Sequence, residues 1–203
     1  IQFVIGILSL MALVAIFLIF NRRYATYLTN EARVDALTGL MTRKTFLHVC
    51  LKSLEAHRDT DGKWGYFVMV DVDLFKELND EYGHPEGDRI LRAIAGKLRD
   101  TFDDLGSIGR MGGDEFAVLV FTPISQAHLQ DCLEQFLQDI TTIHAGTHTV
   151  SCSAGAVAIQ SGKGIEHFYR EADQALYQAK HKRRGQHVLL KGTEQDFSGK
   201  AAL

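Results

Sequence analysis

The sequence predicts an α/β (α+β) domain in which helices cover a sheet, and three observations indicate that class. Segments with helical and strand-like periodicity alternate along most of the chain. Two strand-like runs, 107–111 and 116–121, flank a glycine pair and therefore predict a β-hairpin. With 203 residues, of which 46% are hydrophobic and 23% charged, the chain is long enough for one domain with extensions.

The N-terminal segment is the first extension. Residues 1–20 contain no charged side chain, and a helix of that length spans the ~30 Å hydrocarbon core of a membrane. The following Arg22-Arg23-Tyr24 indicates a cytoplasmic end. We therefore expect a transmembrane helix over 1–21, which places the chain at the inner (cytoplasmic) membrane with its domain in the cytoplasm. A buried core helix and a signal peptide are the competing interpretations, but the segment lacks a basic start and a small-residue cleavage site.

Composition divides the rest of the chain. Residues 22–34 are polar and predict a cytoplasmic linker helix, 35–191 carry the domain, and 192–203 form a polar tail that we expect to be flexible. Because the chain begins with Ile rather than Met, we expect a sensory region upstream of it. The net charge of −3 gives no drive toward nucleic acid. Three scattered cysteines in apolar surroundings indicate reduced thiols.

The elements of the domain follow from hydrophobic periodicity. The expected helices run over about 42–57, 85–102, 125–143 and 164–182, and 75–82 is expected to be a short helical or irregular connection that ends at Gly83. The expected strands are 64–72, 107–111, 116–121, 147–159 and 187–190. Thr42 is a candidate N-cap, Pro85 suits a first helical position, and Gly155 predicts a bulge in its strand. Only the hairpin has to be antiparallel.

Adjacent carboxylates follow the glycine pair of the hairpin. Gly112 and Gly113 leave the backbone bare, and Asp114 and Glu115 stand directly beside it. An ordinary surface turn has the same composition. The hairpin gains a functional interpretation only together with the polar groups found elsewhere in the chain.

Two carboxylates end the apolar strand 64–72. Side chains alternate along a strand, so Asp71 and Asp73 share a face while Val72 points away. Ligands of α/β sheets bind beyond strand ends, and hard cations such as Mg²⁺ prefer carboxylate and carbonyl oxygens. The alternative is a pair of solvated acids at the end of a strand.

Further polar groups follow in two places. Lys76 has the length to reach a phosphate, and the side chains of Asn79 and Asp88 can read the edge of a purine. Asp88 also suits a first helical turn for electrostatic reasons alone. The basic run 180–184 ends the last helix, where cations are favourable in any case, and it is also suited to holding a triphosphate.

Four motifs stand in order between 35 and 190. They are Asp35-Ala36-Leu37-Thr38-Gly39-Leu40; Asp71-Val72-Asp73 with Phe75-Lys76, Asn79, Gly83-His84 and Gly87-Asp88; Arg110-Met111-Gly112-Gly113-Asp114-Glu115-Phe116; and Ala172-Asp173 with Ala175-Leu176-Tyr177 and Ala179-Lys180. In this order and spacing they resemble the GGDEF family, whose members are diguanylate cyclases. A single Gly-Gly-Asp-Glu-Phe is a modest signal, whereas four ordered motifs are a specific one.

The resemblance implies a fold and an activity. The implied fold is related to nucleotidyl cyclases and polymerase palms, with a mainly antiparallel five-stranded central sheet wrapped by helices. The implied reaction condenses two GTP molecules into cyclic di-GMP and two pyrophosphates and depends on Mg²⁺ or Mn²⁺. Each subunit is implied to hold one GTP, so the active unit is a homodimer with facing hairpins.

The resemblance also implies roles for individual positions. Asp71 and Asp114 are the implied metal carboxylates, the backbone carbonyl of Val72 is a further ligand, and Glu115 lies beside them. Asp114 and Glu115 are the candidate catalytic residues, with Asp114 our candidate for taking the proton. The implied substrate contacts are Asn79 and Asp88 for guanine, Leu74, Phe75, Lys76, Lys180 and Arg184 for the phosphates, and Gly112 and Gly113 for close approach of the nucleotide.

The chain departs from the family pattern at three places. The usual x-Asn-Arg after the first motif reads Met41-Thr42-Arg43, and the usual Gly-Arg-Asn after the last helix reads Arg183-Arg184-Gly185. Many members carry Arg-x-x-Asp before the hairpin as a product-inhibition site, and here that place reads Asp103-Asp104-Leu105-Gly106. We therefore expect this inhibitory site to be missing.

Two other functions compete with an active diguanylate cyclase. One is a catalytically inactive GTP-binding module that relays a signal, against which the intact Asp71, Asp114 and Glu115 stand. The other is an enzyme that makes a hybrid purine dinucleotide, which Asp88 disfavours because its carboxylate suits guanine.

Overall fold

The computed structural model describes residues 11, 13–19, 32–57, 63–182 and 185–190. The chain divides into two compact units, Ile1–Arg33 and Val34–Leu203. The second unit contains all the named elements, whose order is β1(Met41–Thr42), α2(Arg43–Ala56), β2(Lys63–Val72), α3(Phe75–Tyr82), α4(His84–Phe102), β3(Gly106–Gly112), β4(Glu115–Val120), α5(Gln126–Ile140), β5(His144–Ala145), β6(His148–Thr149), β7(Cys152–Gln160), α6(Ile165–Lys182) and β8(His187–Leu190).

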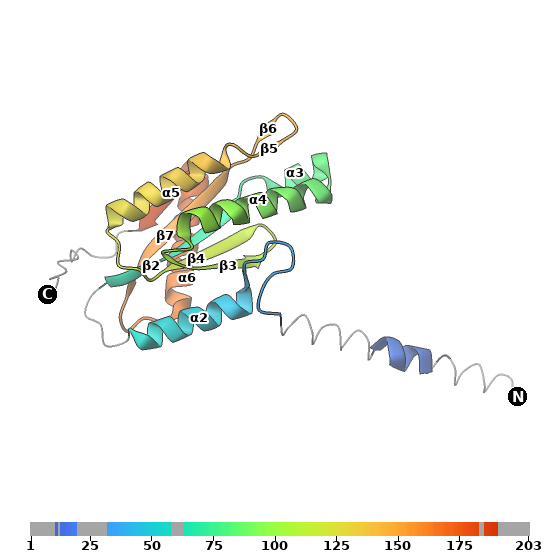
Figure 1. The fold of residues 1–203 in the computed structure, drawn as a ribbon, viewed down its shortest axis with the longest axis horizontal. Helices are drawn as coiled ribbons and strands as arrows, with labels where there is room; N and C mark the ends of the chain where they lie inside the picture. Colours follow the sequence, from blue (N-terminus) through green and yellow to red (C-terminus); the bar gives the residue numbers. More distant parts are fainter. Residues whose placement is uncertain (1–10, 12, 20–31, 58–62, 183–184, 191–203) are drawn as a thin grey trace, which may run out of the picture. The chain divides into compact units, whose positions relative to one another are not determined.

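A mixed six-stranded sheet forms the centre of this unit. Its strand order is β1-β3-β4-β2-β7-β8 (Figure 1). The pairs β3–β4, β4–β2 and β2–β7 are antiparallel, whereas the two edge pairs β1–β3 and β7–β8 are parallel. The expectation of a five-stranded, mainly antiparallel sheet is therefore corrected at the edge, where the two residues of β1 add a sixth strand.

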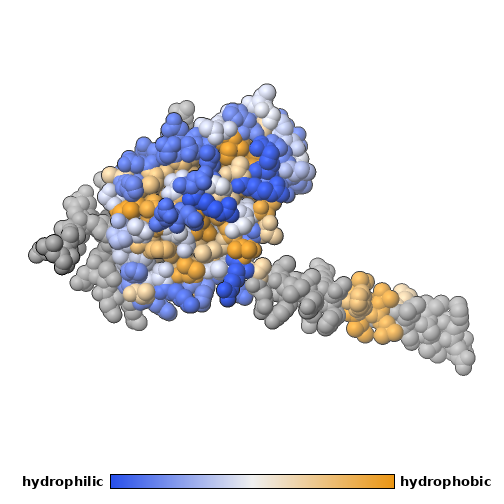
Figure 2. Space-filling view, viewed as in Figure 1, coloured by the Kyte–Doolittle hydropathy of each residue, from blue (hydrophilic) through white to orange (hydrophobic). Residues whose placement is uncertain are grey.

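Helices cover both faces of the sheet. Helices α4 and α5 lie on one face, and α2 and α6 lie on the other (Figure 1). The central strand β2 shows why, because its side chains alternate: Val68 and Val70 belong to the core under α4 and α5, whereas Phe67 and Met69 belong to the core under α2 and α6. Hydrophilic residues cover much of the outer surface of α4 and α5 (Figure 2).

Most predicted helices and strands are present, with two changes near α5. This helix ends at Ile140 rather than near 143, because the hydroxyls of Thr141 and Thr142 donate to the carbonyls of Gln138 and Asp139 and close its last turn. The strand predicted over 147–159 is divided. A small hairpin of β5 and β6 turns at Gly146, where φ is 56°, and β7 begins only at Cys152.

Gly155 does not form the predicted bulge. It pairs regularly with Met69 in the antiparallel ladder between β7 and β2. A Cβ atom on Gly155 would lie 2.2 Å from the backbone nitrogen of Leu176 and 2.3 Å from the carbonyl oxygen of Ala172. The glycine is required by the close approach of α6 to β7, which brings the C-terminal half of α6 near the end of β2.

The predicted membrane anchor is not borne out. The structure describes part of the predicted span 1–21, namely Met11 and the helical residues 13–19, which are exposed and apolar (Figure 2). Among the described residues, no helix is long and apolar enough to cross a membrane. This finding overturns the predicted location at the inner membrane. The predicted linker helix over 22–34 lies mostly outside the described residues, and so does the predicted tail.

Candidate active site

The hairpin between β3 and β4 presents the glycine pair and the two adjacent acids. Gly112 and Gly113 have φ values of 148° and 53°, which favour glycine, and a Cβ atom on either would meet nothing within 4 Å. The guanidinium of Arg110 donates to the Gly113 carbonyl from Nε (3.1 Å) and from Nη2 (2.7 Å). The turn is therefore held from one side and open on the other.

Asp71 lies at the end of β2, next to this hairpin. It pairs in register with Glu115 of β4, and the Val72 N–H donates to the Asp114 carbonyl at 3.3 Å. Burial raises the pKa of Asp71 above its ordinary value, the Lys180 ammonium opposes that shift, and the charges of Asp114 and Glu115 add to it. The site thus gathers negative charge from two neighbouring strands.

Lys180 of α6 is the cation at this site. Its Nζ donates to Asp71 Oδ1 at 2.6 Å, and the Asp71 side chain is only 13% exposed. The Lys180 side chain is 35% exposed, so its ammonium also reaches solvent beyond the strand end. A lysine in this position is able to exchange a carboxylate partner for a phosphate.

A second group of predicted residues lies on α3 and α4. Asn79 Oδ1 is buried and has no hydrogen-bond partner among the described residues. A Cβ atom on Gly87 would lie 1.9 Å from that oxygen, so a glycine is required beside it. Asp88 follows on the first turns of α4, half-buried, with Arg92 Nη2 at 4.0 Å. An orphaned buried acceptor is suited to a ligand that brings its own N–H donors.

The segment between these groups has an unusual backbone. Leu74 connects β2 to α3 with φ 57° and ψ 29°, a left-handed conformation that leucine rarely adopts, and its side chain is exposed. Phe75 packs against the core under α4, and Lys76 is exposed. The remaining predicted phosphate contact, Arg184, lies outside the described residues.

The donor set is chemically suited to a divalent cation. Carboxylates at Asp71, Asp114 and Glu115 and the carbonyl of Val72 are hard oxygen ligands, and Mg²⁺ commonly takes one or two carboxylates together with substrate phosphates and water. Among the described residues, no three acidic, His or Cys side chains already surround one point. Of these carboxylates, Asp71 forms an ion pair with Lys180.

Two groups around the site were not assigned by the sequence analysis. Asp73 is not a solvated strand end but a buried carboxylate, which accepts hydrogen bonds from Ser151, Ser153 and Gly185. Asp35 accepts a hydrogen bond from the guanidinium of Arg110, on β3 of the hairpin. No local signal predicts these partners, because they are far away in the chain.

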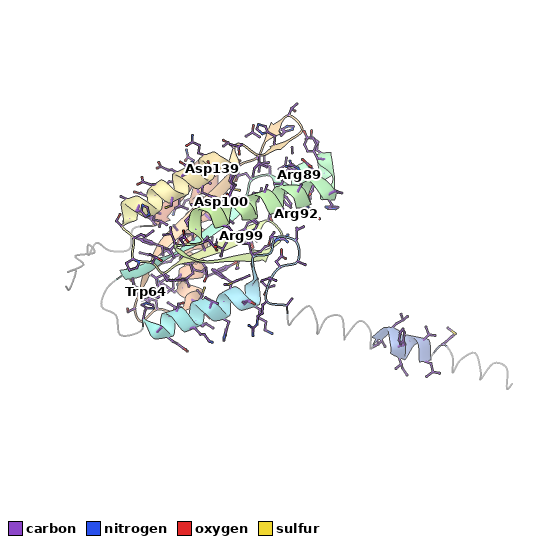
Figure 3. All side chains as sticks on the ribbon, in the orientation of Figure 1. Trp64, Arg89, Arg92, Arg99, Asp100 and Asp139 are labelled. Carbon is purple, nitrogen blue, oxygen red and sulfur yellow. The ribbon has the colours of Figure 1, made fainter. Side chains whose placement is uncertain are left out.

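The first motif is also held by α4, from which Arg89, Arg92 and Arg99 project (Figure 3). The Arg99 guanidinium donates to the Thr38 carbonyl, and the Thr38 hydroxyl donates to Asp35 at 2.7 Å. The turn 35–40 therefore contacts both α4 and the hairpin. It positions the side of the hairpin that faces away from Asp71.

Fold and site together define an α/β domain in which carboxylates and a lysine gather at a strand end beside a glycine hairpin. The chain belongs to the GGDEF family: the family model described as "Diguanylate cyclase, GGDEF domain" matches residues 32–186.

Curated relatives carry the same domain. The chain is 37% identical over 155 residues to the diguanylate cyclase DgcS of Shewanella oneidensis, covering 75% of this chain and 51% of the relative. It is 36% identical over 155 residues to the diguanylate cyclase DgcP of Pseudomonas aeruginosa, covering 74% and 23%. A 33% identical relative from the same organism is named cyclic di-GMP phosphodiesterase NbdA. The chain spans between 20% and 51% of the length of these relatives.

Solved structures share the fold. Diguanylate cyclase SiaD from Pseudomonas aeruginosa, solved with its activator SiaC, has a TM-score of 0.71 at 28% identity, covering 90% of this chain and 71% of that one. The coiled coil and GGDEF domain of DgcB from Caulobacter crescentus, solved with c-di-GMP, has a TM-score of 0.73 over 90% of this chain and 100% of that one. Its identity of 23% supports likeness of fold alone.

Proposed function

We propose that this domain is a diguanylate cyclase that condenses two GTP molecules into cyclic di-GMP and two pyrophosphates. The observation that carries the proposal is the pairing of Asp71 with Glu115 beside Lys180, which gathers carboxylate oxygens and an ammonium group at one strand end. The homologues named diguanylate cyclase favour the same reaction.

The cation proposed for this site is Mg²⁺ or Mn²⁺, held by Asp71, Asp114, Glu115 and the Val72 carbonyl. When bound there, it neutralises charge on the α-phosphate and lowers the pKa of the attacking 3′-hydroxyl. In the proposed complex Lys180, Lys76 and Arg184 would hold the phosphates, together with the backbone at Leu74 and Phe75. Asp114 is our candidate for accepting the proton of the hydroxyl.

The proposed guanine site uses Asn79 and Asp88. The buried Oδ1 of Asn79 lacks a partner among the described residues and accepts a guanine N–H in this proposal. The Asp88 carboxylate accepts from the ring N–H and the exocyclic amine. Because adenine offers no such pair of donors on that edge, Asp88 disfavours ATP and hence a hybrid dinucleotide product.

A homodimer is the proposed active unit. Each site holds one GTP, and the 3′-hydroxyl of one nucleotide has to reach the α-phosphate of the other. Two facing hairpins provide that positioning, and the open side of Gly112 and Gly113 leaves room for the nucleotides. Turnover per subunit should therefore rise with protein concentration.

Product formation tests the proposal. Purified protein with GTP and Mg²⁺ should yield cyclic di-GMP, and Asp114→Ala should abolish the product, whereas the exposed Asp131→Ala on α5 should have no effect. Persistent turnover in Asp114→Ala would contradict the assignment. GTP binding by a folded dimer without any product would instead favour the inactive signal-relay module, and mixed ATP and GTP would reveal a hybrid product.

We also propose that product inhibition through Arg-x-x-Asp is absent. Asp103 and Asp104 are exposed after α4, where the family's arginine is replaced by an acid. Like charges repel the phosphates of cyclic di-GMP at that surface. Tight cyclic di-GMP binding that stops turnover and is relieved by substitution at 103–106 would contradict this.

A further inference from the structure

Asp73 is a buried carboxylate near the proposed site that accepts hydrogen bonds on both of its oxygens. It is 5% exposed. Its Oδ2 accepts from the Ser151 hydroxyl at 2.7 Å and from the Gly185 N–H at 3.0 Å, and its Oδ1 accepts from the Ser153 hydroxyl at 2.8 Å. With three donors on its oxygens, this carboxylate is poorly placed to become a metal ligand.

These bonds join three parts of the chain. Asp73 follows β2, Ser151 and Ser153 lie at the start of β7, and Gly185 lies three residues after the end of α6. Gly185 has φ 76°, so the chain turns sharply there, and a Cβ atom would meet only Ser151 Cβ at 3.6 Å. The glycine is thus needed for the turn that offers its N–H to Asp73, and not for lack of space.

Asp71 contacts α6 itself, whereas Asp73 contacts the chain just beyond the end of that helix. Asp71 holds Lys180, and Asp73 holds Gly185, five residues further along the chain. The Asp71 contact is with a flexible, partly exposed side chain, which the proposed metal and phosphates would draw away. The Asp73 contact is with the backbone N–H of Gly185, a group to which no cation or phosphate contact is assigned.

We propose that Asp73 is a positioning residue, which anchors the backbone at Gly185, beyond the end of α6, so that Lys180 stays beside the phosphates when Asp71 binds the cation. This inference rests on the proposed function. Asp73 touches neither nucleotide nor cation in this role. Its effect on phosphate binding passes through Lys180, whereas the guanine contacts on α3 and α4 are independent of it.

A buried carboxylate with three donors also stabilises the fold, so the test has to separate positioning from stability. The probes are 3′-deoxy-GTP, which lacks the attacking hydroxyl, and GMP, which lacks the outer phosphates, each titrated in Mg²⁺. Asp73→Ala should weaken 3′-deoxy-GTP binding about tenfold and GMP binding less than about twofold. Equal losses for both probes would overturn the proposal, since general loosening does not distinguish them.

A double-mutant cycle supplies the second readout. If Asp73 acts through Lys180, adding Asp73→Ala to Lys180→Ala should weaken 3′-deoxy-GTP binding by less than about twofold more. Full additivity would show that the two residues act independently and would overturn the proposal. The matched control is Ser125→Ala, which removes the N-cap bond to His128 of α5 and lowers stability without touching this network. It should leave both affinities unchanged.

Asp73→Asn keeps the test decisive if Asp73→Ala does not fold. An amide retains one acceptor for the Gly185 N–H, so 3′-deoxy-GTP affinity should recover to within about threefold of the wild type. No recovery in a folded Asp73→Asn protein would contradict positioning through Gly185. Wild-type protein that binds no 3′-deoxy-GTP would overturn the proposed function itself, whereas normal wild-type binding with unaffected Asp73 variants would overturn this inference alone.

Discussion

Arg110 Nη1 lies 3.0 Å from Asp35 Oδ1, and the same guanidinium also holds the Gly113 carbonyl. One side chain therefore joins the first turn of the domain to the hairpin that carries Asp114. Neither partner is freely solvated, since the Arg110 side chain is 15% exposed and the Asp35 side chain is 26% exposed. Arg110 and the pairing of β4 with β2 therefore hold the strands of the hairpin, while its glycine turn is open on one side.

The ion pair between Asp35 and Arg110 makes the free energy of unfolding depend on pH. Burial alone raises the pKa of Asp35, but hydrogen bonds from Thr38 and the charge of Arg110 outweigh it and lower the pKa below 3.8. A lowered pKa in the fold means that stability is present above the ordinary value and is lost as pH falls toward the folded one. Asp35→Asn should cost about 1–3 kcal/mol at pH 7, with the difference shrinking below pH ~4.

Urea unfolding of both proteins from pH 7 to pH 3 measures this effect. The comparison protein is Asp100→Asn, a change at an exposed acid of α4. A gap between wild type and Asp35→Asn that stays constant over this range would contradict the assignment of the ion pair.

The contribution of Asp71 to stability depends on pH in the opposite direction. Its pKa is raised, chiefly by burial, so the fold holds the proton more tightly and stability falls as pH rises from the ordinary value to the raised one. Asp71→Asn should therefore leave the metal-free protein as stable or up to about 1 kcal/mol more stable at pH 8, while abolishing cyclase activity.

Thermal unfolding with and without Mg²⁺ and 3′-deoxy-GTP separates the two effects. Ligand should raise the wild-type Tm and leave that of Asp71→Asn nearly unchanged, because only binding to the folded state stabilises it. An equal ligand-induced shift in both proteins would remove Asp71 from the proposed metal site.

Leu74 is strained where the phosphates are proposed to bind. A left-handed conformation costs a residue with a Cβ roughly 1–2 kcal/mol, and Asn tolerates it better. Because the proposed phosphate contact at Leu74 is with the backbone, Leu74→Asn should raise stability by about 1 kcal/mol and keep GTP turnover. Leu74→Val should lower stability. A large loss of turnover in Leu74→Asn would assign a role to the exposed side chain instead.

The sequence predicted local features better than distant ones. The segment 75–82, predicted as a helical or irregular connection, is the helix α3, and Gly83 with φ 83° ends it as predicted. The parallel pairing of β8 with β7 and the short strand β1 have no local signal, since each depends on where a helix returns the chain. The same holds for Asp73, whose partners lie 78, 80 and 112 residues away.

The candidate site was predictable only in part. Motif resemblance assigned Asp71, Asn79 and Lys180. The structure places Asp71 and Lys180 in contact and buries an oxygen of Asn79 that has no hydrogen-bond partner within the described part of the chain. Their roles toward GTP remain predictions. The ion pair between Lys180 and Asp71 was not predicted, because the resemblance assigned Asp71 to a cation and Lys180 to the phosphates and implied no contact between them.

Alanine substitutions at two glycines test how tightly α6 is packed against the sheet. Gly155→Ala places a methyl group within 2.3 Å of the α6 backbone at Leu176 and Ala172, which cannot move as a flexible side chain does. It should therefore lower the free energy of unfolding by about 2 kcal/mol or more. Because α6 carries Lys180, 3′-deoxy-GTP binding should also weaken, whereas GMP binding should change less.

Gly96→Ala is the matched control for this substitution. Gly96 lies within α4, and a Cβ atom there meets nothing within 4 Å. Alanine should therefore raise stability by about 0.5–1 kcal/mol through helix propensity alone, with no effect on nucleotide binding. Denaturant unfolding of the two variants should move the midpoints in opposite directions. If Gly155→Ala is as well tolerated as Gly96→Ala, α6 does not approach β7 as closely as described, and the placement of Lys180 beside Asp71 loses its support.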